Sequence, residues 1–171
     1  MKTGLVNLKR AKCPAHVYLA LLILIFSCRC NPTLAMDLIT PAEASLPAVN
    51  LLNVRGPVPG PEIQLISPAP TAEVDGGLPV QAMTDVIKAP FSIVLRFIPH
   101  GGAKIDVDTL SLKYIKNPFV DLTQRVRPYT SLTGVNIVDA NMPAGEHLIR
   151  VQIKDTRGRL GTAFIKLRSS E

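Results

Sequence analysis

The chain has 171 residues, of which 47% are hydrophobic, 5% are aromatic and 19% are charged, and its formal net charge is +6. Five basic residues precede Met36, so a chain that begins at Met36 has 14 basic and 13 acidic residues and a net charge of +1. This balance leaves no basic stripe that could neutralise phosphates, and it excludes nucleic acid as an expected partner.

Residues 1–35 have the pattern of a secretory signal peptide. Basic residues come first, and an apolar run at residues 17–26 follows them. The run is too short to span a bilayer, which needs about 20 apolar residues, so it predicts export and no membrane span. Thr33 and Ala35 place small side chains at the positions that signal peptidase recognises. We therefore expect cleavage after Ala35, a mature chain that begins at Met36, and a location in the periplasm or on the cell surface.

The leader has a second interpretation, as the signal of a lipoprotein. All three cysteines, Cys13, Cys28 and Cys30, precede Met36. The stretch Ile25-Phe26-Ser27-Cys28 resembles a lipobox, which would make Cys28 a lipidated first residue and give the protein a lipid anchor. Cleavage after the small residues is the favoured interpretation. It leaves a mature chain without disulfides, whose stability depends on an apolar core.

Residues 36–60 are expected to form an extended spacer. Proline fixes φ and removes a backbone donor, so a proline-rich segment should be largely unpaired. The apolar residues here are more numerous than a linker needs, and we expect part of the segment to pack along the domain as an edge. The alternative is a short partner-binding segment. The prolines are Pro41, Pro47, Pro57 and Pro59.

Residues 61–171 are expected to form one all-β domain. Hydrophobic and polar residues alternate along them, a pattern that half-buried antiparallel strands produce and helices do not. Turn residues separate about seven short strands at a spacing of about ten residues, which is typical of a single β-sandwich. The predicted strands are residues 62–66, 91–98, 110–114, 120–126, 135–138, 146–155 and 160–168, with 120–126 paired to 135–138, a connection at 139–145 and a hairpin turn at 156–159.

Two of these strands are expected to supply the centre of the core from facing sheets, because both alternate without interruption. The inward side chains of the last strand follow from the same alternation. The predicted core residues are Phe91, Ile93, Leu95 and Phe97 on one side and Ile149, Val151 and Ile153 on the other, with Ala163, Ile165 and Leu167 from the last strand.

Several turns and corners carry a family resemblance. Gly102-Ala-Lys-Ile-Asp106, Met142-Pro143-Ala-Gly145-Glu-His147 and Lys154-Asp155-Thr-Arg-Gly158 resemble motifs of the bacterial immunoglobulin-like domains found in surface and periplasmic proteins. The resemblance covers about residues 62–168 and implies an immunoglobulin-like antiparallel β-sandwich. It also implies work as a spacer, an adhesion module or an accessory module, without catalysis.

The residues that could carry chemistry form no strong motif. Asp106 and Asp108 share a face, as a calcium site would need, but calcium takes six to eight oxygen ligands, so exposed turn carboxylates are favoured. His100 and His147 lack cysteine partners, and a structural role is favoured for them over a metal site. The sequence has no Gly-x-Ser-x-Gly elbow and no phosphate loop. We expect no enzyme, no catalytic residues, no metal and no cofactor.

The leading functional hypothesis is an accessory module that binds a protein of the bacterial envelope or cell surface through a sheet face or an open strand edge. Val94, Leu148 and Phe164 point outward by the alternation and form the candidate binding surface. The alternative for these three is that they lie under a neighbouring segment. A C-terminal basic cluster is interpreted as a solvated face and not as an anion site; it consists of Arg150, Lys154, Arg157, Arg159, Lys166 and Arg168.

The second functional hypothesis is a periplasmic copper carrier. The entry Ser67-Pro68-Ala69 resembles that of the copper-resistance carriers, and the thioethers of Met36, Met83 and Met142 are soft ligands for Cu(I). Those carriers use a histidine at the mature N-terminus, which Met36 does not supply.

Overall fold

A computed structural model describes residues 35–49 and 60–170 of the chain. The predicted signal peptide, Cys28 and residues 50–59 lie outside the described residues. Among the helices that the structure describes, none has the length and apolar character needed to cross a membrane.

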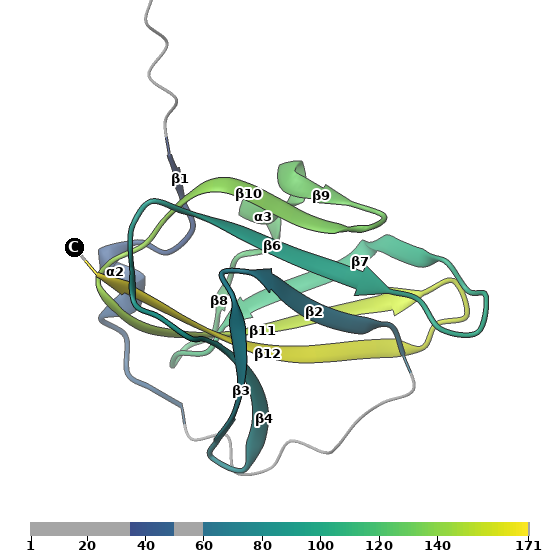
Figure 1. The fold of residues 1–171 in the computed structure, drawn as a ribbon, viewed down its shortest axis with the longest axis horizontal. Helices are drawn as coiled ribbons and strands as arrows, with labels where there is room; N and C mark the ends of the chain where they lie inside the picture. The colour runs from purple at the N-terminus through teal and green to yellow at the C-terminus, as the bar shows by residue number, and fades with distance from the viewer. Residues whose placement is uncertain (1–34, 50–59, 171) are drawn as a thin grey trace, which may run out of the picture. The chain divides into compact units, whose positions relative to one another are not determined.

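The described residues form two β-sheets that pack against each other (Figure 1). The prediction of a sandwich-like β fold is confirmed, because most of the described residues lie in the strands of these two sheets. The described residues form twelve strands where about seven were expected, and three of the strand pairings are parallel where an antiparallel sandwich was expected. The five-stranded sheet has the order β1 (Met36–Asp37), β10 (Gly134–Asn141), β6 (Phe91–Ile98) and β2 (Glu62–Ser67), with β9 (Thr130–Ser131) also paired to β10. The seven-stranded sheet has the order β3 (Pro70–Asp75), β4 (Leu78–Met83), β12 (Leu160–Ser170), β11 (Gly145–Asp155), β7 (Ile105–Tyr114) and β8 (Val120–Asp121), with β5 (Ile87–Lys88) also paired to β12.

The core lies between the two sheets, where sequence alternation predicted it. The inward side chains of β6 are buried, while Ser92 and Arg96 on the same strand are exposed. In β11 the inward positions are also buried, and Val151 has no exposed surface. The predicted contact between these strands is confirmed, because one apolar cluster contains both sets: Phe91, Ile93, Leu95 and Phe97 with Ile149, Val151 and Ile153.

The region at residues 120–126 differs from the predicted strand. β8 has only two residues and pairs with β7, and it is followed by α3 (Thr123–Val126) and the 3₁₀-helix η1 (Arg127–Tyr129). The Asp121 carboxylate accepts a hydrogen bond of 2.8 Å from the Thr123 N–H, which turns the chain. Leu122 and Val126, four residues apart, are fully buried on one face. The predicted pairing with residues 135–138 is therefore wrong, and the predicted connection at 139–145 is shortened because β10 continues to Asn141.

The described part of the predicted spacer packs along the domain, as was expected for part of this segment. β1 pairs in parallel with β10, and Leu38 and Ile39 behind it are buried in the core. The short helix α2 (Pro41–Ala44) then begins with a capping box, in which the side chains of Thr40 and Glu43 each accept from the other's backbone N–H. Residues 36–48 are thus not the extended, unpaired chain that their prolines predicted.

An ion pair holds this segment against α3. The Arg125 guanidinium donates two hydrogen bonds to the Glu43 carboxylate, at 2.7 and 2.8 Å, and a third to the Leu38 carbonyl. The Arg125 hydrogen bonds lower the pKa of Glu43 to about 2. The proline content of the segment could not reveal this contact, because its partner lies 82 residues away in the sequence.

Candidate functional site: an open strand edge

The three residues predicted to form a binding surface lie on different sheets. Val94 is half-buried on the outer face of β6, in the five-stranded sheet. Leu148 and Phe164 lie on the seven-stranded sheet, and Phe164 is only 5% exposed because Leu78 and Val80 of β4 pack over it. For Phe164 the structure therefore matches the alternative of a side chain covered by a neighbouring segment.

The segment that covers Phe164 is the hairpin of β3 and β4, at the end of the seven-stranded sheet, which projects beyond the other strands (Figure 1). Gly76 and Gly77 form its two-residue loop with φ values of 56° and 83°. Only glycine adopts such angles without strain at both positions, and this geometry matches the twist of paired strands. The glycine pair was the one sequence signal that could have predicted the hairpin. The strands of this hairpin were not predicted, because Pro70 and Pro79 lie in them and proline is unfavourable within a strand.

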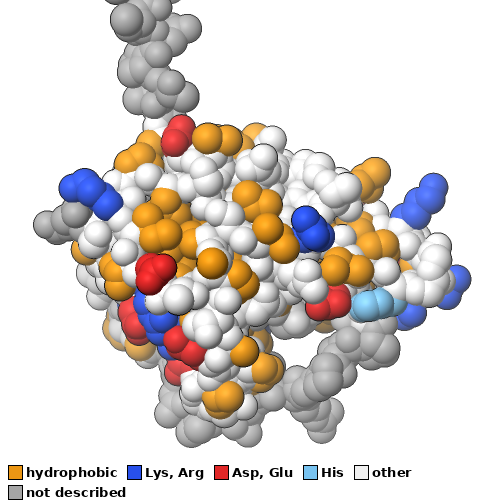
Figure 2. All heavy atoms as spheres, viewed as in Figure 1, with side chains coloured by type: hydrophobic (Ala, Val, Ile, Leu, Met, Phe, Trp, Pro, Cys, Tyr) orange, Lys and Arg blue, Asp and Glu red, His pale blue; other side chains and the backbone are white. Residues whose placement is uncertain are grey.

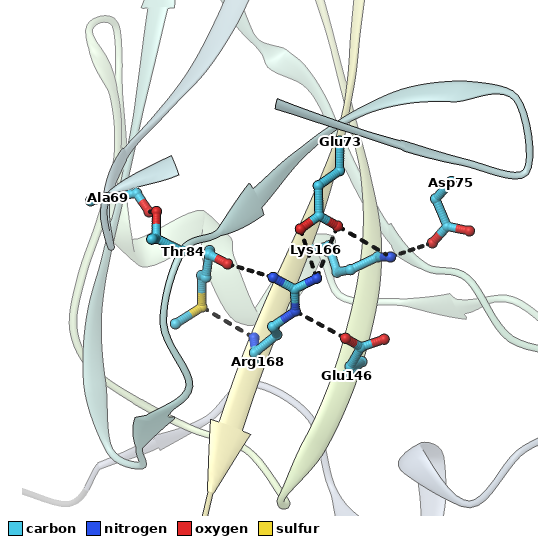
Figure 3. A network of polar contacts seen from close by, with 8 residues as sticks. Ala69, Glu73, Asp75, Thr84, Glu146, Lys166 and Arg168 are labelled. Atoms are coloured by element: carbon cyan, nitrogen blue, oxygen red, sulfur yellow. Dashed lines mark hydrogen bonds and ion pairs between the residues drawn. The ribbon is translucent and has the colours of Figure 1, made fainter. Parts of the chain in front are cut away.

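A network of charged side chains fastens the hairpin to the sheet (Figure 3). Arg168 of β12 donates to both oxygens of Glu73, at 2.8 and 2.9 Å, to the Met83 carbonyl at 2.7 Å and to Glu146 at 2.9 Å. Lys166 pairs with Asp75 at 2.6 Å. The hydrogen bond to Asp75 raises the pKa of Lys166.

This network contains two members of the C-terminal basic cluster. Lys166 and Arg168 are neutralised by acids of the hairpin and of β11, and Arg159 pairs with the buried Asp155 at 2.7 Å. Figure 2 shows acidic and basic side chains interleaved beside the hairpin. These three cations serve intramolecular contacts and leave no common anion site.

The outer edge of β3 is open. β3 is the terminal strand of its sheet and pairs only with β4 among the described strands. Val74 lies opposite Pro79, which has no N–H, so this is a pair that exchanges no hydrogen bonds. The N–H and C=O of Val74 therefore point away from β4, and by alternation so do those of Ala72. Both residues are exposed, Val74 by 77%.

The outer edge of β2, the terminal strand of the other sheet, is closed by a side chain. The Gln81 carboxamide donates to the Ile63 carbonyl and accepts from the Leu65 N–H, both at 2.7 Å. It thereby occupies two backbone groups that a neighbouring strand would use. The two long terminal strands thus differ: a side chain occupies the outer edge of β2, whereas no described strand pairs with the outer edge of β3.

A groove of about 430 Å³ lies beside the hairpin, between β4, the first half of β12 and the start of β2. Its lining is mostly apolar. Two carboxylates, Glu62 and Glu73, belong to it, and no Lys or Arg is among the described residues that line it. The apolar part consists of Pro61, Ile63, Ala72, Pro79, Val80, Ala163 and Phe164.

His147 is a buried structural residue, 2% exposed. Its Nε2 lies 2.8 Å from the Pro143 carbonyl, which can only accept, so Nε2 carries the proton. Nδ1 then accepts from the Tyr114 hydroxyl at 3.0 Å. Burial lowers the pKa of His147 and raises the pKa of Tyr114 to about 12. Ser169 also donates to the Pro143 carbonyl, so the neighbouring serine and histidine do not form a nucleophile and base.

The other candidate ligands are not brought together. His100 is exposed in a turn, and Asp108 is exposed and faces Arg127 at 3.4 Å. Met83 and Met142 are buried in the core, and Met36 packs against it. Within residues 35–49 and 60–170, no group of three or more His, Cys, Asp or Glu side chains could hold a metal ion.

Comparisons of the chain with family models, with curated proteins and with solved structures gave no match.

Proposed function

We propose that this chain is an exported, non-catalytic, immunoglobulin-like module that binds another protein of the bacterial envelope or cell surface. Binding occurs by strand addition at β3. The observation that carries the proposal is the open edge at Ala72 and Val74, where main-chain donors and acceptors face outward on an exposed strand.

The edge has few of the devices that usually protect terminal strands. Proteins block such edges with lysines, prolines, bulges or very short strands. The one proline of β3, Pro70, is its first residue, so it leaves the outward backbone groups of Ala72 and Val74 in place. β3 has six residues, contains no lysine and keeps an uninterrupted register with β4. Its two acids do not guard the edge, because Glu73 and Asp75 turn toward Arg168 and Lys166.

The hairpin is also held in place before any partner arrives. The hydrogen bonds from Arg168 reach both β3 and β4, and Leu78 and Val80 pack on Phe164. A strand that is already ordered loses little conformational entropy on binding, so its main-chain hydrogen bonds contribute more fully to affinity.

The remaining parts of the proposal rest on the sequence and the coarse fold. The leader supports export, with the periplasm or the cell surface as the location. Two packed sheets and the turn motifs that resemble bacterial immunoglobulin-like domains support that fold type. Such a domain supplies surfaces, which suits an accessory role.

The experiment places a photo-crosslinking amino acid at Val74 in intact cells, with Val138 as the matched control. Val138 is an exposed valine, 61% accessible, on β10 of the other sheet. We expect a crosslinked protein partner from position 74 and none from position 138. Crosslinking from 138 alone would contradict the proposal.

A second variant tests the backbone directly. Val74→Pro removes the outward N–H without breaking a hydrogen bond to β4, whereas Val74→Thr keeps that donor. We expect the partner to be lost from the proline variant and retained by the threonine variant, with thermal unfolding showing that both are folded. Equal recovery of the partner by the two variants would rule out strand addition.

A further inference from the structure

We infer that the groove beside the β3–β4 hairpin is the specificity pocket for the added strand. It receives a large apolar side chain of an extended segment that also carries a Lys or Arg close to that side chain. This inference rests on the proposed function, because it assumes that the segment pairs with β3, and it adds the chemistry that selects the partner.

Ala72 links the open edge to the groove. Its main chain faces outward from β3, and the residue also lines the groove, together with Gln81, which lies opposite it on β4, and Pro79, two residues before Gln81. Side chains alternate along a strand, so a segment paired at Ala72 turns every second side chain toward this hollow. Pockets for alternate side chains are the usual source of specificity in strand addition.

The small size of Ala72 keeps the hollow open. The walls are apolar, with Ile63, Val80 and Phe164 among them, and the volume of about 430 Å³ exceeds what the alanine methyl fills. Burial of apolar surface favours a bulky hydrophobic side chain here, at about 25 cal/mol for each Å² removed from water.

The charges at the groove favour a basic residue in the partner. Glu62 and Glu73 are the charged side chains among the described lining residues. Glu73 already accepts from Arg168, but the exposed Glu62 accepts only from the Gln64 amide among the described residues, at 2.7 Å. Among the described residues Glu62 has no cationic partner, so a Lys or Arg of the added segment would complement this carboxylate beside the apolar hollow.

A second copy of this chain fits the site less well. β3 itself contains no Lys or Arg and no apolar side chain larger than that of Val74. Pairing of two β3 strands would therefore supply neither the bulky apolar side chain nor the basic side chain that the groove favours. The occupant is therefore a segment of a different protein.

The test selects displayed peptides of random sequence on the purified protein and measures the affinity of the enriched peptide. We expect enriched sequences with a large apolar residue and a nearby Lys or Arg. Ala72→Trp fills the groove and should weaken binding by about tenfold or more, while Thr71→Trp, on the opposite face of the same strand, should change it by less than about twofold. Thr71 and Ala72 are both exposed, so both variants should fold.

A charge-reversal variant is the second test of the groove. Glu62→Lys should shift the selected sequences from basic to acidic residues, whereas Asp108→Lys, an equal charge change at an exposed site away from the groove, should not. Equal affinity for the native protein and Ala72→Trp, or unchanged selection by Glu62→Lys, would overturn the inference. If Val74→Pro nevertheless abolishes binding of the enriched peptide, strand addition is supported and only the pocket is ruled out. If Val74→Pro also leaves binding unchanged, both strand addition and the pocket are ruled out.

Discussion

At the scale of single residues, His147 shows how one buried imidazole couples the fold to pH. Its neutral form fits between two partners, with Nε2–H donating to Pro143 and Nδ1 accepting from Tyr114. A second proton would place a charge in the core and remove the acceptor that Tyr114 uses. The sequence favoured a structural role for this histidine, but it could not reveal the hydrogen-bond partners.

We expect the protein to lose stability in mild acid because of His147. Its pKa in the folded state is lowered from the ordinary value of 6.5. The stability that the neutral form contributes is therefore complete above pH 6.5 and is lost as the pH falls from 6.5 toward the lowered folded value. Urea unfolding at about pH 7.5 and about pH 5 should show the decline, and His147→Gln should flatten it. An unchanged slope in that variant would assign the pH dependence to another group.

Val151 and Lys154 offer a matched test of the inner and outer faces of β11. Val151 is fully buried, and Lys154 is exposed. Val151→Asp should unfold the domain, because an unpaired buried carboxylate costs several kcal/mol against a total stability of about 5–15 kcal/mol. Lys154→Asp makes the same carboxylate in water and should be tolerated. Equal melting temperatures would contradict the assignment of faces.

At the scale of elements, the β3–β4 hairpin depends on contacts from β12. Arg168 bonds to Glu73, to the Met83 carbonyl and to Glu146, and its side chain is only 19% exposed. Removal of one partner leaves the others partly buried and unsatisfied. This is the costly way to break a polar network.

We therefore expect Arg168→Ala to destabilise the hairpin by about 1–3 kcal/mol. Arg127→Ala is the control, because that side chain is 48% exposed and meets Asp108 at 3.4 Å; its loss should cost less than about 0.5 kcal/mol. Amide hydrogen exchange over Pro70–Met83 should rise selectively in the Arg168 variant. Equal exchange in the two variants would mean that apolar packing on Phe164 alone holds the hairpin.

Elements were predictable from the sequence where local pattern and tertiary burial agree. β6 and β11 alternate over their whole length, and the structure places their inward residues in the core as expected. α3 was missed because four residues are too few to show a helical period, and its stability comes from the burial of Leu122 and Val126. The open edge was missed for a similar reason: only the pairing of Val74 with Pro79 reveals which way its backbone points.

At the scale of the whole molecule, the predicted cleavage site lies directly before the first described strand. Met36 is the first residue of β1 and lies opposite Ala140 of β10. A peptidase that cuts after Ala35 would release a chain whose first residues enter the sheet directly.

We expect Met36 to be the N-terminus of the mature protein. Terminal sequencing and intact mass of protein recovered from the cell envelope would show it, because Thr33 and Ala35 satisfy the small-residue rule. A diacylglyceryl-modified Cys28 would contradict this prediction and would place the domain on a lipid anchor. Ala35→Arg should block processing, whereas Cys28→Ser should leave it unchanged.

The protection of the β2 edge depends on one amide group, that of Gln81. Its Nε2 and Oε1 stand in for a missing strand beside β2. Deamidation to glutamate would replace the donor with a charged oxygen that repels the Ile63 carbonyl, and the exposed row of backbone groups would then invite stacking between molecules. Chemical ageing at a single side chain could thus turn a finished sheet into a template for aggregation.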